Sequence, residues 1–311
     1  MYTILKYIFI IIIIFLFIIY IYCDDIDKYL NTIERFEDMF DNFEKYEEIY
    51  DKEFVDFYEI IYRDFGDIDK DTDIIFKKIF EPIENKENIN VLVGGCGVGK
   101  LCKKIKDKYK NVIGVDISEN MLNKAQILYP NIKFVRGNIC KNSIFKKNTF
   151  SHIYIDERTL YYNKDIDNII KNSFDWLSER GFLIIQIYDP ENLKLAARYY
   201  STNYIDDKQN LHGFTYLNNF SHDCYYIKGT KENEIDYYDK IILEDGKKRI
   251  KKTTFYIPPK ENVYDTVLNN GFELFYIEKI RDLQIVGGYE LVIFRKKSTQ
   301  SSVEDIENNK K

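Results

Sequence analysis

The glycine-rich segment VLVGGCGVGK, residues 91–100, constrains the fold of this chain more than any other part of its sequence. An apolar run precedes Gly95, Gly97 and Gly99, and residues 101–109 carry apolar side chains at helical spacing. The segment therefore predicts a buried strand, a tight turn and a helix. Glycines at such a turn let a ligand approach the backbone, because side chains there would block it.

Apolar runs and amphipathic segments continue to alternate after this turn. Repeated strand-helix units predict an α/β fold with a doubly wound, mostly parallel sheet, which a C-terminal hairpin completes to seven strands. Ser118 is the expected N-cap of one helix, and Gly271 is expected to end another. The expected strands are residues 90–93, 112–115, 132–135, 150–155, 182–188, 272–278 and 289–295, and the expected helices are 101–109, 119–129, 169–177 and 263–268.

The α/β domain is expected at residues 89–295, with other segments before, inside and after it. Residues 195–258 break the alternation and predict an inserted antiparallel β cap, whose clearest strands are 225–228, 234–243 and 249–256. Residues 25–88 place aromatic side chains at helical spacing and predict two or three helices that pack over the sheet edge. The polar tail at 296–311 is expected to be disordered.

The first 24 residues predict a membrane anchor. Residues 7–23 carry no charge, and a helix of that length at ~1.5 Å per residue just crosses a hydrocarbon core. A cleaved secretory signal is the alternative, although the run is long and lacks a small-x-small cleavage pattern. Basic residues on the two sides of the run do not fix its orientation, since Lys6 precedes it and Lys28 and Arg35 follow it.

Charge and cysteine content exclude several classes of function. The formal net charge is -6, with lysines and acids interspersed, so a nucleic-acid backbone would be repelled and no nucleic-acid partner is expected. The five cysteines are odd in number and lack the spacing of a disulfide framework or a zinc ligand set. We therefore expect reduced thiols and no bound metal.

Asp116 ends the strand that follows the glycine turn. A carboxylate at this place can accept both hydroxyl protons of a ribose, a pairing shared by dinucleotide enzymes and methyltransferases. With this acid, the chain resembles the class I S-adenosylmethionine-dependent methyltransferases over about residues 50–295. The matching segments are VLVGGCGVGK, VIGVDISENMLNKA at 112–125, LSERGFLIIQ at 177–186 and the sheet ending at 271–274.

The resemblance implies a Rossmann-like methyltransferase fold, S-adenosylmethionine as cofactor and a set of cofactor-binding residues. The glycine turn would border the methionine moiety, Asp116 would hold the ribose, and the remaining residues would contact the adenine. Val93 replaces the acid that is usual near the cofactor's amino group, and Asn138 replaces a common aspartate. The implied cofactor residues are Gly94, Gly95, Cys96, Gly97, Gly99, Asp116, Ile117, Met121, Asn138 and Ile139.

Three alternatives remain open at this point. A nicotinamide-binding enzyme would need a third glycine where Lys100 stands, and a phosphate-binding P-loop would need serine or threonine where Leu101 stands. A methyltransferase-like fold without activity would fit Val93 and Asn138, since a fold does not establish activity. A cytosolic domain is favoured because the implied cofactor is made in the cytosol.

Methyl transfer from a sulfonium needs an aligned acceptor, excluded water and, for some acceptors, a proton acceptor. Asp156 and Glu157 follow the fourth strand and are the expected catalytic residues. Tyr58, Tyr62, Arg158, Tyr161 and Tyr162 are expected to face the substrate, although packing is the commoner role of such aromatic residues. His152 is expected to be buried in its strand. The acceptor is expected to be a small molecule, with a protein side chain as the alternative.

Overall fold

The computed structural model describes most of the chain beyond residue 49. The described residues are 50–61, 73–74, 77–78, 88–109, 111–155, 157–164, 166–188, 202–205, 211–217, 220–228, 232–244, 246–280 and 289–298. Within them, we find no helix with the length and apolar content needed to cross a bilayer. The predicted anchor at 1–24 and the end of the predicted tail, 299–311, lie outside the described residues, so both stay predictions.

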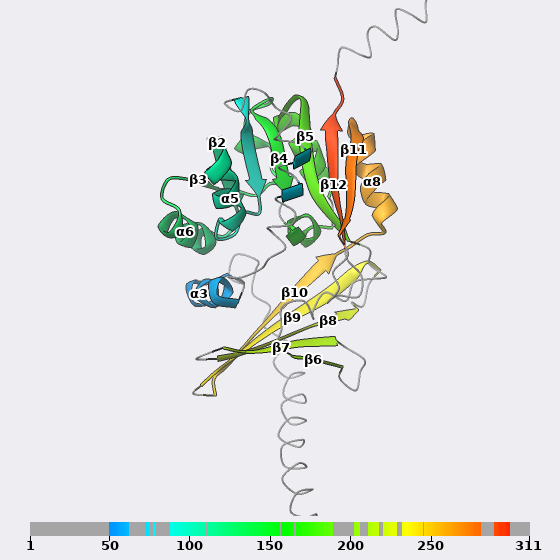
Figure 1. Ribbon diagram of the computed structural model, residues 1–311. Coiled ribbons are helices and arrows are strands. Elements are labelled where there is room, and N and C mark those ends of the chain that lie inside the picture. Colours follow the sequence, from blue (N-terminus) through cyan, green and yellow to red (C-terminus); the bar gives the residue numbers. More distant parts are fainter. Residues whose placement is uncertain are drawn as a thin grey trace, which may run out of the picture. The chain divides into compact units, whose positions relative to one another are not determined.

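A seven-stranded sheet forms the centre of the fold, in the order β11-β12-β5-β4-β1-β2-β3 (Figure 1). The pairs β1–β2, β2–β3, β1–β4 and β4–β5 are parallel, and β12 pairs antiparallel with both β5 and β11. The predicted sheet is thus confirmed. The strands are β1 (Asn90–Gly94), β2 (Asn111–Asp116), β3 (Lys133–Arg136), β4 (Phe150–Ile155), β5 (Leu177–Tyr188), β11 (Phe272–Ile280) and β12 (Tyr289–Lys296).

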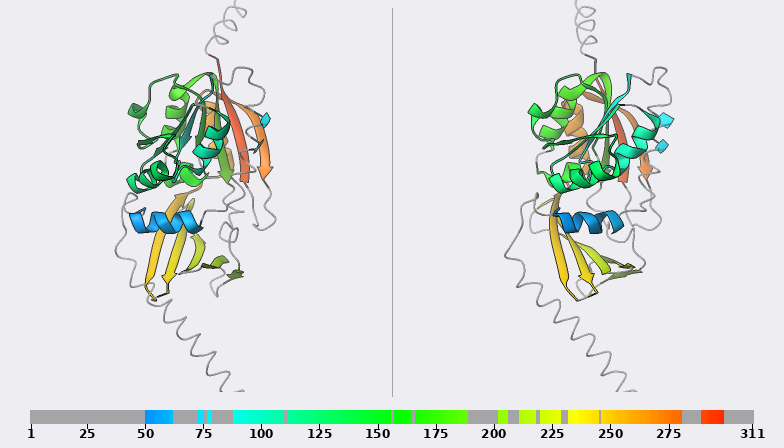
Figure 2. Two further views of the ribbon diagram at one scale, coloured as in Figure 1. Left: turned by 60° about the vertical axis from the view of Figure 1, so that its left-hand side comes forward. Right: turned by 90° about the vertical axis from the view of Figure 1, so that its left-hand side faces the viewer.

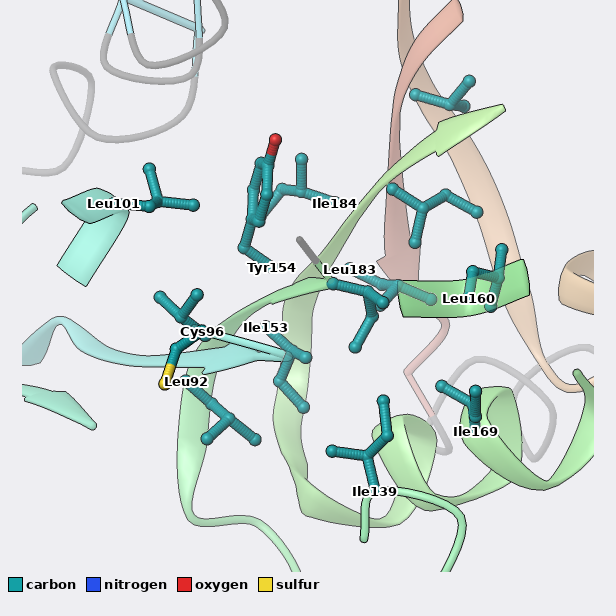
Figure 3. Close-up of a cluster of buried hydrophobic side chains, with 14 of the residues drawn as sticks. Leu92, Cys96, Leu101, Ile139, Ile153, Tyr154, Leu160, Ile169, Leu183 and Ile184 are labelled. Carbon is teal, nitrogen blue, oxygen red and sulfur yellow. The ribbon is translucent and has the colours of Figure 1, made fainter. Parts of the chain in front are cut away.

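The apolar runs of the parallel strands are buried on both faces. Side chains of Leu92, Ile153 and Leu183, from three adjacent strands, point to one face, where Ile139 and Ile169 meet them (Figure 3). The neighbouring residues of these strands point to the other face and are buried as well. Helices therefore cover both sides, as a parallel sheet requires. They are α5 (Lys100–Lys108), α6 (Glu119–Leu128), α7 (Asp167–Trp176) and α8 (Lys260–Asn269).

The start of β5 differs from the prediction. We expected this strand to begin at residue 182, but β5 already begins at Leu177, and its register with β4 shifts before Phe182. Lys296 contributes to this arrangement, because its buried ammonium donates to the carbonyls of Phe174 and Leu177 at 2.8 and 2.7 Å. The end of β12 thus satisfies the carbonyls at the end of α7.

The insertion is a separate five-stranded antiparallel sheet in the order β10-β9-β8-β7-β6. The predicted turn between its last two strands is present, with Gly246 at φ 80° and its N–H donating to the carbonyl of Leu243. β6 and β7 were missed, and β8 starts earlier than predicted. The strands are β6 (Thr202–Ile205), β7 (Leu211–Leu217), β8 (Phe220–Lys228), β9 (Glu234–Leu243) and β10 (Lys248–Tyr256).

Helix α3 (Lys52–Ile61) lies in the region predicted to be helical, between the seven-stranded sheet's helices and the yellow strands of the insertion (Figure 2). Phe54 and Val55 pack in one buried cluster with Val98 and Met121 on one side and Ile241 on the other. We expected this region to cover the sheet edge. Helix α3 contacts α6 and the inserted sheet, whereas Lys78 lies over the ring of Tyr276 on the edge strand β11. Most of the remaining region lies outside the described residues, so the rest of this prediction stays open.

Candidate functional site

The glycine turn and Asp116 meet because their strands are adjacent and parallel. Gly94 pairs with Val115 of β2 on one side and with Ile155 of β4 on the other, so the carboxyl ends of the three strands lie at one edge. The backbone N–H groups of Gly95 and Cys96 both donate to the carbonyl of Val115, at 2.8 and 3.0 Å. These bonds fix the turn beside the end of β2.

The three glycines of the turn have positive φ angles but different surroundings. A Cβ on Gly95 would lie 1.9 Å from Oγ1 of Thr159, and one on Gly99 would lie 2.7 Å from the ring of Phe134. A Cβ on Gly97 would meet nothing within 4 Å. The backbone at Gly97 therefore borders open space, whereas Gly95 and Gly99 are needed for packing.

Asp116 is 8% exposed, and each of its oxygens accepts one backbone hydrogen bond. The N–H of Gly97 donates to Oδ2 and that of Ser118 to Oδ1, both at 2.9 Å. Burial raises the pKa of this carboxyl, and the backbone hydrogen bonds oppose that shift. A carboxylate has about four acceptor positions, so Asp116 can accept two further protons, as a ribose diol would supply.

A cavity of about 240 Å³ opens beside these groups. Five of the predicted cofactor residues line it, together with residues of the 3-10 helix η4 (Glu157–Tyr162) that follows β4. Asn138 accepts the N–H of Cys140 with its side-chain oxygen at 2.9 Å, so its NH2 group is the one that can donate to a ligand. The lining residues are Gly95, Val115, Asp116, Ile117, Gly137, Asn138, Ile139, Thr159, Tyr162 and Asn163.

Apart from Gly97, the other predicted cofactor residues lie close by and pack against the protein. Cys96 is buried in the main core, and Gly99 forms the N-cap of α5. Met121 was expected beside the adenine, but it packs against α3 in the cluster with Phe54. Its position follows from the N-cap of α6, where Oγ of Ser118 accepts the N–H of Met121 at 3.3 Å. A Cβ on Gly94 would lie 3.0 Å from the side chain of Ile155 and 3.6 Å from that of Ile139.

The predicted catalytic and substrate-facing residues are only partly described. Asp156 and Tyr62, and the side chains of Glu157 and Arg158, lie outside the described residues. Tyr58 is half-buried on α3, with its ring centroid 6.2 Å from that of Tyr50.

Tyr161 is fully buried in the core. Its hydroxyl donates to the carbonyl of Gln186 at 3.0 Å and accepts the N–H of Tyr188 at 3.2 Å. Burial raises its pKa. Tyr161 therefore holds η4 against β5, and its neighbour Tyr162 is the tyrosine in the cavity wall.

Sequence reasoning missed Thr159 and Asn163, which also line the cavity. Their position directly after β4 was the available signal, because the carboxyl end of that strand lies at the ligand-binding edge. His152 was correctly expected to be buried. It stacks on Phe182, and burial lowers its pKa to about 3, so it is neutral at pH 7.

Residues 91–181 match the family model described as "Methyltransferase domain". A curated relative, phosphoethanolamine N-methyltransferase of Plasmodium falciparum, is 33% identical over 116 residues, which are 36% of this chain and 44% of that protein. The chain thus matches less than half the length of this relative. Residues 91–181, which the family model matches, include the glycine turn, Asp116, Asn138 and η4.

Solved structures share the fold at low identity. One is an S-adenosylmethionine-dependent methyltransferase from Clostridium acetobutylicum, with a TM-score of 0.60 and 18% identity over 79% of this chain and 98% of that chain. Another is CalS10 of Micromonospora echinaspora, an amino pentose methyltransferase solved with S-adenosylmethionine bound. Its TM-score is 0.56, with 14% identity over 76% of this chain and 95% of that chain. These likenesses extend the shared fold well beyond the residues that the family model matches.

Proposed function

We propose that this chain, whose residues 91–181 match a methyltransferase domain model, is a class I S-adenosylmethionine-dependent methyltransferase that transfers a methyl group to a small-molecule amine. One observation carries the proposal. The open backbone at Gly97 and the buried carboxylate of Asp116 are joined by a 2.9 Å hydrogen bond, and both lie at the carboxyl edge of the sheet. This arrangement fits a ribose on one side and an extended chain along the glycine turn on the other.

The residues around the cavity fit the nucleoside part of the cofactor. Asp116 would hold the ribose hydroxyls, Ile117 and Ile139 offer apolar contacts to the adenine, and Asn138 can donate to one of its nitrogens. The methionine part would lie along Gly95 and Gly97. When bound, S-adenosylmethionine supplies an electrophilic methyl group on a positively charged sulfur.

The phosphate-binding alternative fits the structure poorly. The residue that must coordinate magnesium in a P-loop is replaced by Leu101, and this side chain is buried in the core. Asp116 would also have no role in such a site. A nicotinamide enzyme would need glycine at Lys100, which is the first residue of α5.

An amine acceptor is supported by the relative and by the described wall of the cavity. The relative is a phosphoethanolamine N-methyltransferase, and an amine needs no base once it is neutral. The side of the cavity formed by η4 and the residue after it offers Thr159, Tyr162 and Asn163, which can orient an N–H group but are not strong bases. Among the described lining residues, Asp116 is the single carboxylate, and it belongs to the ribose side.

Parallel titrations of the full-length chain in mild detergent test the cofactor. We expect S-adenosylhomocysteine to bind, and we expect NAD and ATP-magnesium not to bind at comparable concentrations. ATP-magnesium binding that Lys100→Ala abolishes would contradict the proposal. Cofactor binding without methyl transfer to any acceptor would instead indicate a binding module with this fold.

A further inference from the structure

We infer that the hydroxyl groups of Tyr50 and Tyr162 form a pair that holds the acceptor nitrogen at the cofactor cavity. In this arrangement Tyr162 contacts the substrate, and Tyr50 is a positioning residue that acts through Tyr162. The inference rests on the proposed function, because it assigns residues and an acceptor class to the same site.

The two hydroxyl oxygens are 2.8 Å apart, although the residues are 112 positions apart in the sequence. Tyr162 lines the cavity together with Asp116 and Asn138, so it reaches the cofactor site from η4. Tyr50 immediately precedes α3 and is almost fully buried. The pair therefore joins the wall of the cavity to the N-terminal helix.

Several contacts fix the position of Tyr50. Its carbonyl accepts the Nδ2–H of Asn120 at 2.9 Å, which ties it to α6. On the other side, Asp51 forms an ion pair with Arg249 of the inserted sheet. Further along α3, Asp56 pairs with Lys124 of α6 at 2.9 Å. These contacts hold the backbone around Tyr50 from both sides, so its side chain needs little reorganisation to position Tyr162.

Aromatic rings and the ammonium of one lysine lie around the pair. The ammonium of Lys251 lies over the rings of Tyr50 and Phe54, at 3.9 and 4.4 Å from their centroids. The ring of Tyr162 lies 5.0 Å from that of Phe255, on the same inserted sheet. Because like charges repel, this resident ammonium favours the neutral form of an amine at the pair, which is the form that attacks the methyl carbon.

The pair can orient an amine without acting as a base. The amine N–H donates to Oη of Tyr162, whose own proton donates to Oη of Tyr50, and the nitrogen lone pair then faces the methyl carbon. The new C–N bond forms as the C–S bond breaks, and the bonding electron pair stays on sulfur. The positive charge passes to nitrogen, which later releases a proton to water. A hydroxyl acceptor would have to lose its proton during the attack.

The test measures methyl transfer by the full-length chain from labelled S-adenosylmethionine to matched probes. The amine probes are phosphoethanolamine, ethanolamine and glucosamine, and their hydroxyl counterparts are 2-hydroxyethyl phosphate, ethylene glycol and glucose. Tyr50→Phe, Tyr162→Phe and the double variant keep the rings and remove the hydroxyls. Tyr264→Phe is the control, since it removes a hydroxyl with a 2.8 Å hydrogen bond to Glu290.

We expect the wild type to methylate at least one amine and none of the hydroxyl probes. Each single variant should lower kcat by about 10- to 100-fold, which is the value of one hydrogen bond to a developing charge. The double variant should lose no more than the singles, because the two hydroxyls act as a unit. Affinity for S-adenosylhomocysteine should stay within about twofold, and Tyr264→Phe should match the wild type.

Each other outcome overturns a defined part of this account. Transfer to a hydroxyl probe, or to none of the probes while S-adenosylhomocysteine still binds, would refute the amine acceptor. Wild-type rates in Tyr50→Phe, or independent losses that multiply in the double variant, would refute the pair but leave the proposed function intact. If the wild type does not bind S-adenosylhomocysteine, the proposed function itself is refuted.

Discussion

Gly95→Ala is expected to destabilise the fold by about 2 kcal/mol or more and to abolish measurable S-adenosylhomocysteine binding. The added Cβ would lie 1.9 Å from Oγ1 of Thr159 and 2.7 Å from its Cβ, and the backbone at Gly95 has a φ of 72°. Thr159 cannot move away without shifting η4, which forms the cavity wall. Thermal unfolding and isothermal titration measure the two effects.

Thr159→Ala provides a test of the physical cause. Combined with Gly95→Ala, it removes the two closest contacts but leaves the Cβ contact and the backbone strain, so we expect part of the lost stability to return. Additive losses in the double variant would show that the collision with Thr159 is not the cause. Gly246→Ala is the control, because this glycine also has a positive φ but lies in the turn of the inserted sheet.

Asp116→Ala is expected to lower the affinity for S-adenosylhomocysteine by about 100-fold or more. Hydrogen bonds from two ribose hydroxyls to a charged acceptor contribute about 1.5–3 kcal/mol each, and tenfold in affinity corresponds to about 1.4 kcal/mol. The variant also removes the acceptor for the N–H groups of Gly97 and Ser118, which shape the turn. Isothermal titration measures the loss, and thermal unfolding separates it from a change in stability.

The protonation of Asp116 adds a pH dependence. Burial raises the pKa of this carboxyl, so affinity should fall as pH falls through that raised pKa, because the protonated form accepts fewer hydrogen bonds. Asp107→Ala is the control, since this exposed aspartate pairs with Lys103 on the surface of α5. If Asp116→Ala bound S-adenosylhomocysteine as tightly as the wild type, the proposal that Asp116 binds the ribose would be wrong.

The sequence was sufficient to predict the seven-stranded sheet and the proximity of the glycine turn to Asp116. Local signals carried this prediction, because the apolar runs, the glycine turn and Asp116 belong to adjacent strand-helix units. In a parallel sheet the carboxyl ends of adjacent strands lie at one edge, so Asp116 had to lie near Gly97. The burial of His152 followed in the same way from alternation along β4.

Contacts between distant segments could not be predicted in this way. The sequence placed Met121 near the start of α6. It could not show that the side chain of Met121 packs against α3, which is far away in the sequence. The pair of Tyr50 and Tyr162 joins residues that are 112 positions apart, and no local pattern records that contact. β6 and β7 were missed because TNYI and LHGFTYL lack a clear apolar alternation.

The measurement that tests the central claim most directly is titration of Gly97→Ala with S-adenosylhomocysteine, beside its thermal unfolding. A Cβ at Gly97 meets no protein atom within 4 Å, so stability should fall by only about 1 kcal/mol, through the φ of 52°. If the cofactor lies along this backbone, the methyl group occupies its space, and affinity should fall at least about 100-fold. Gly97→Ala that binds S-adenosylhomocysteine as tightly as the wild type would contradict the account.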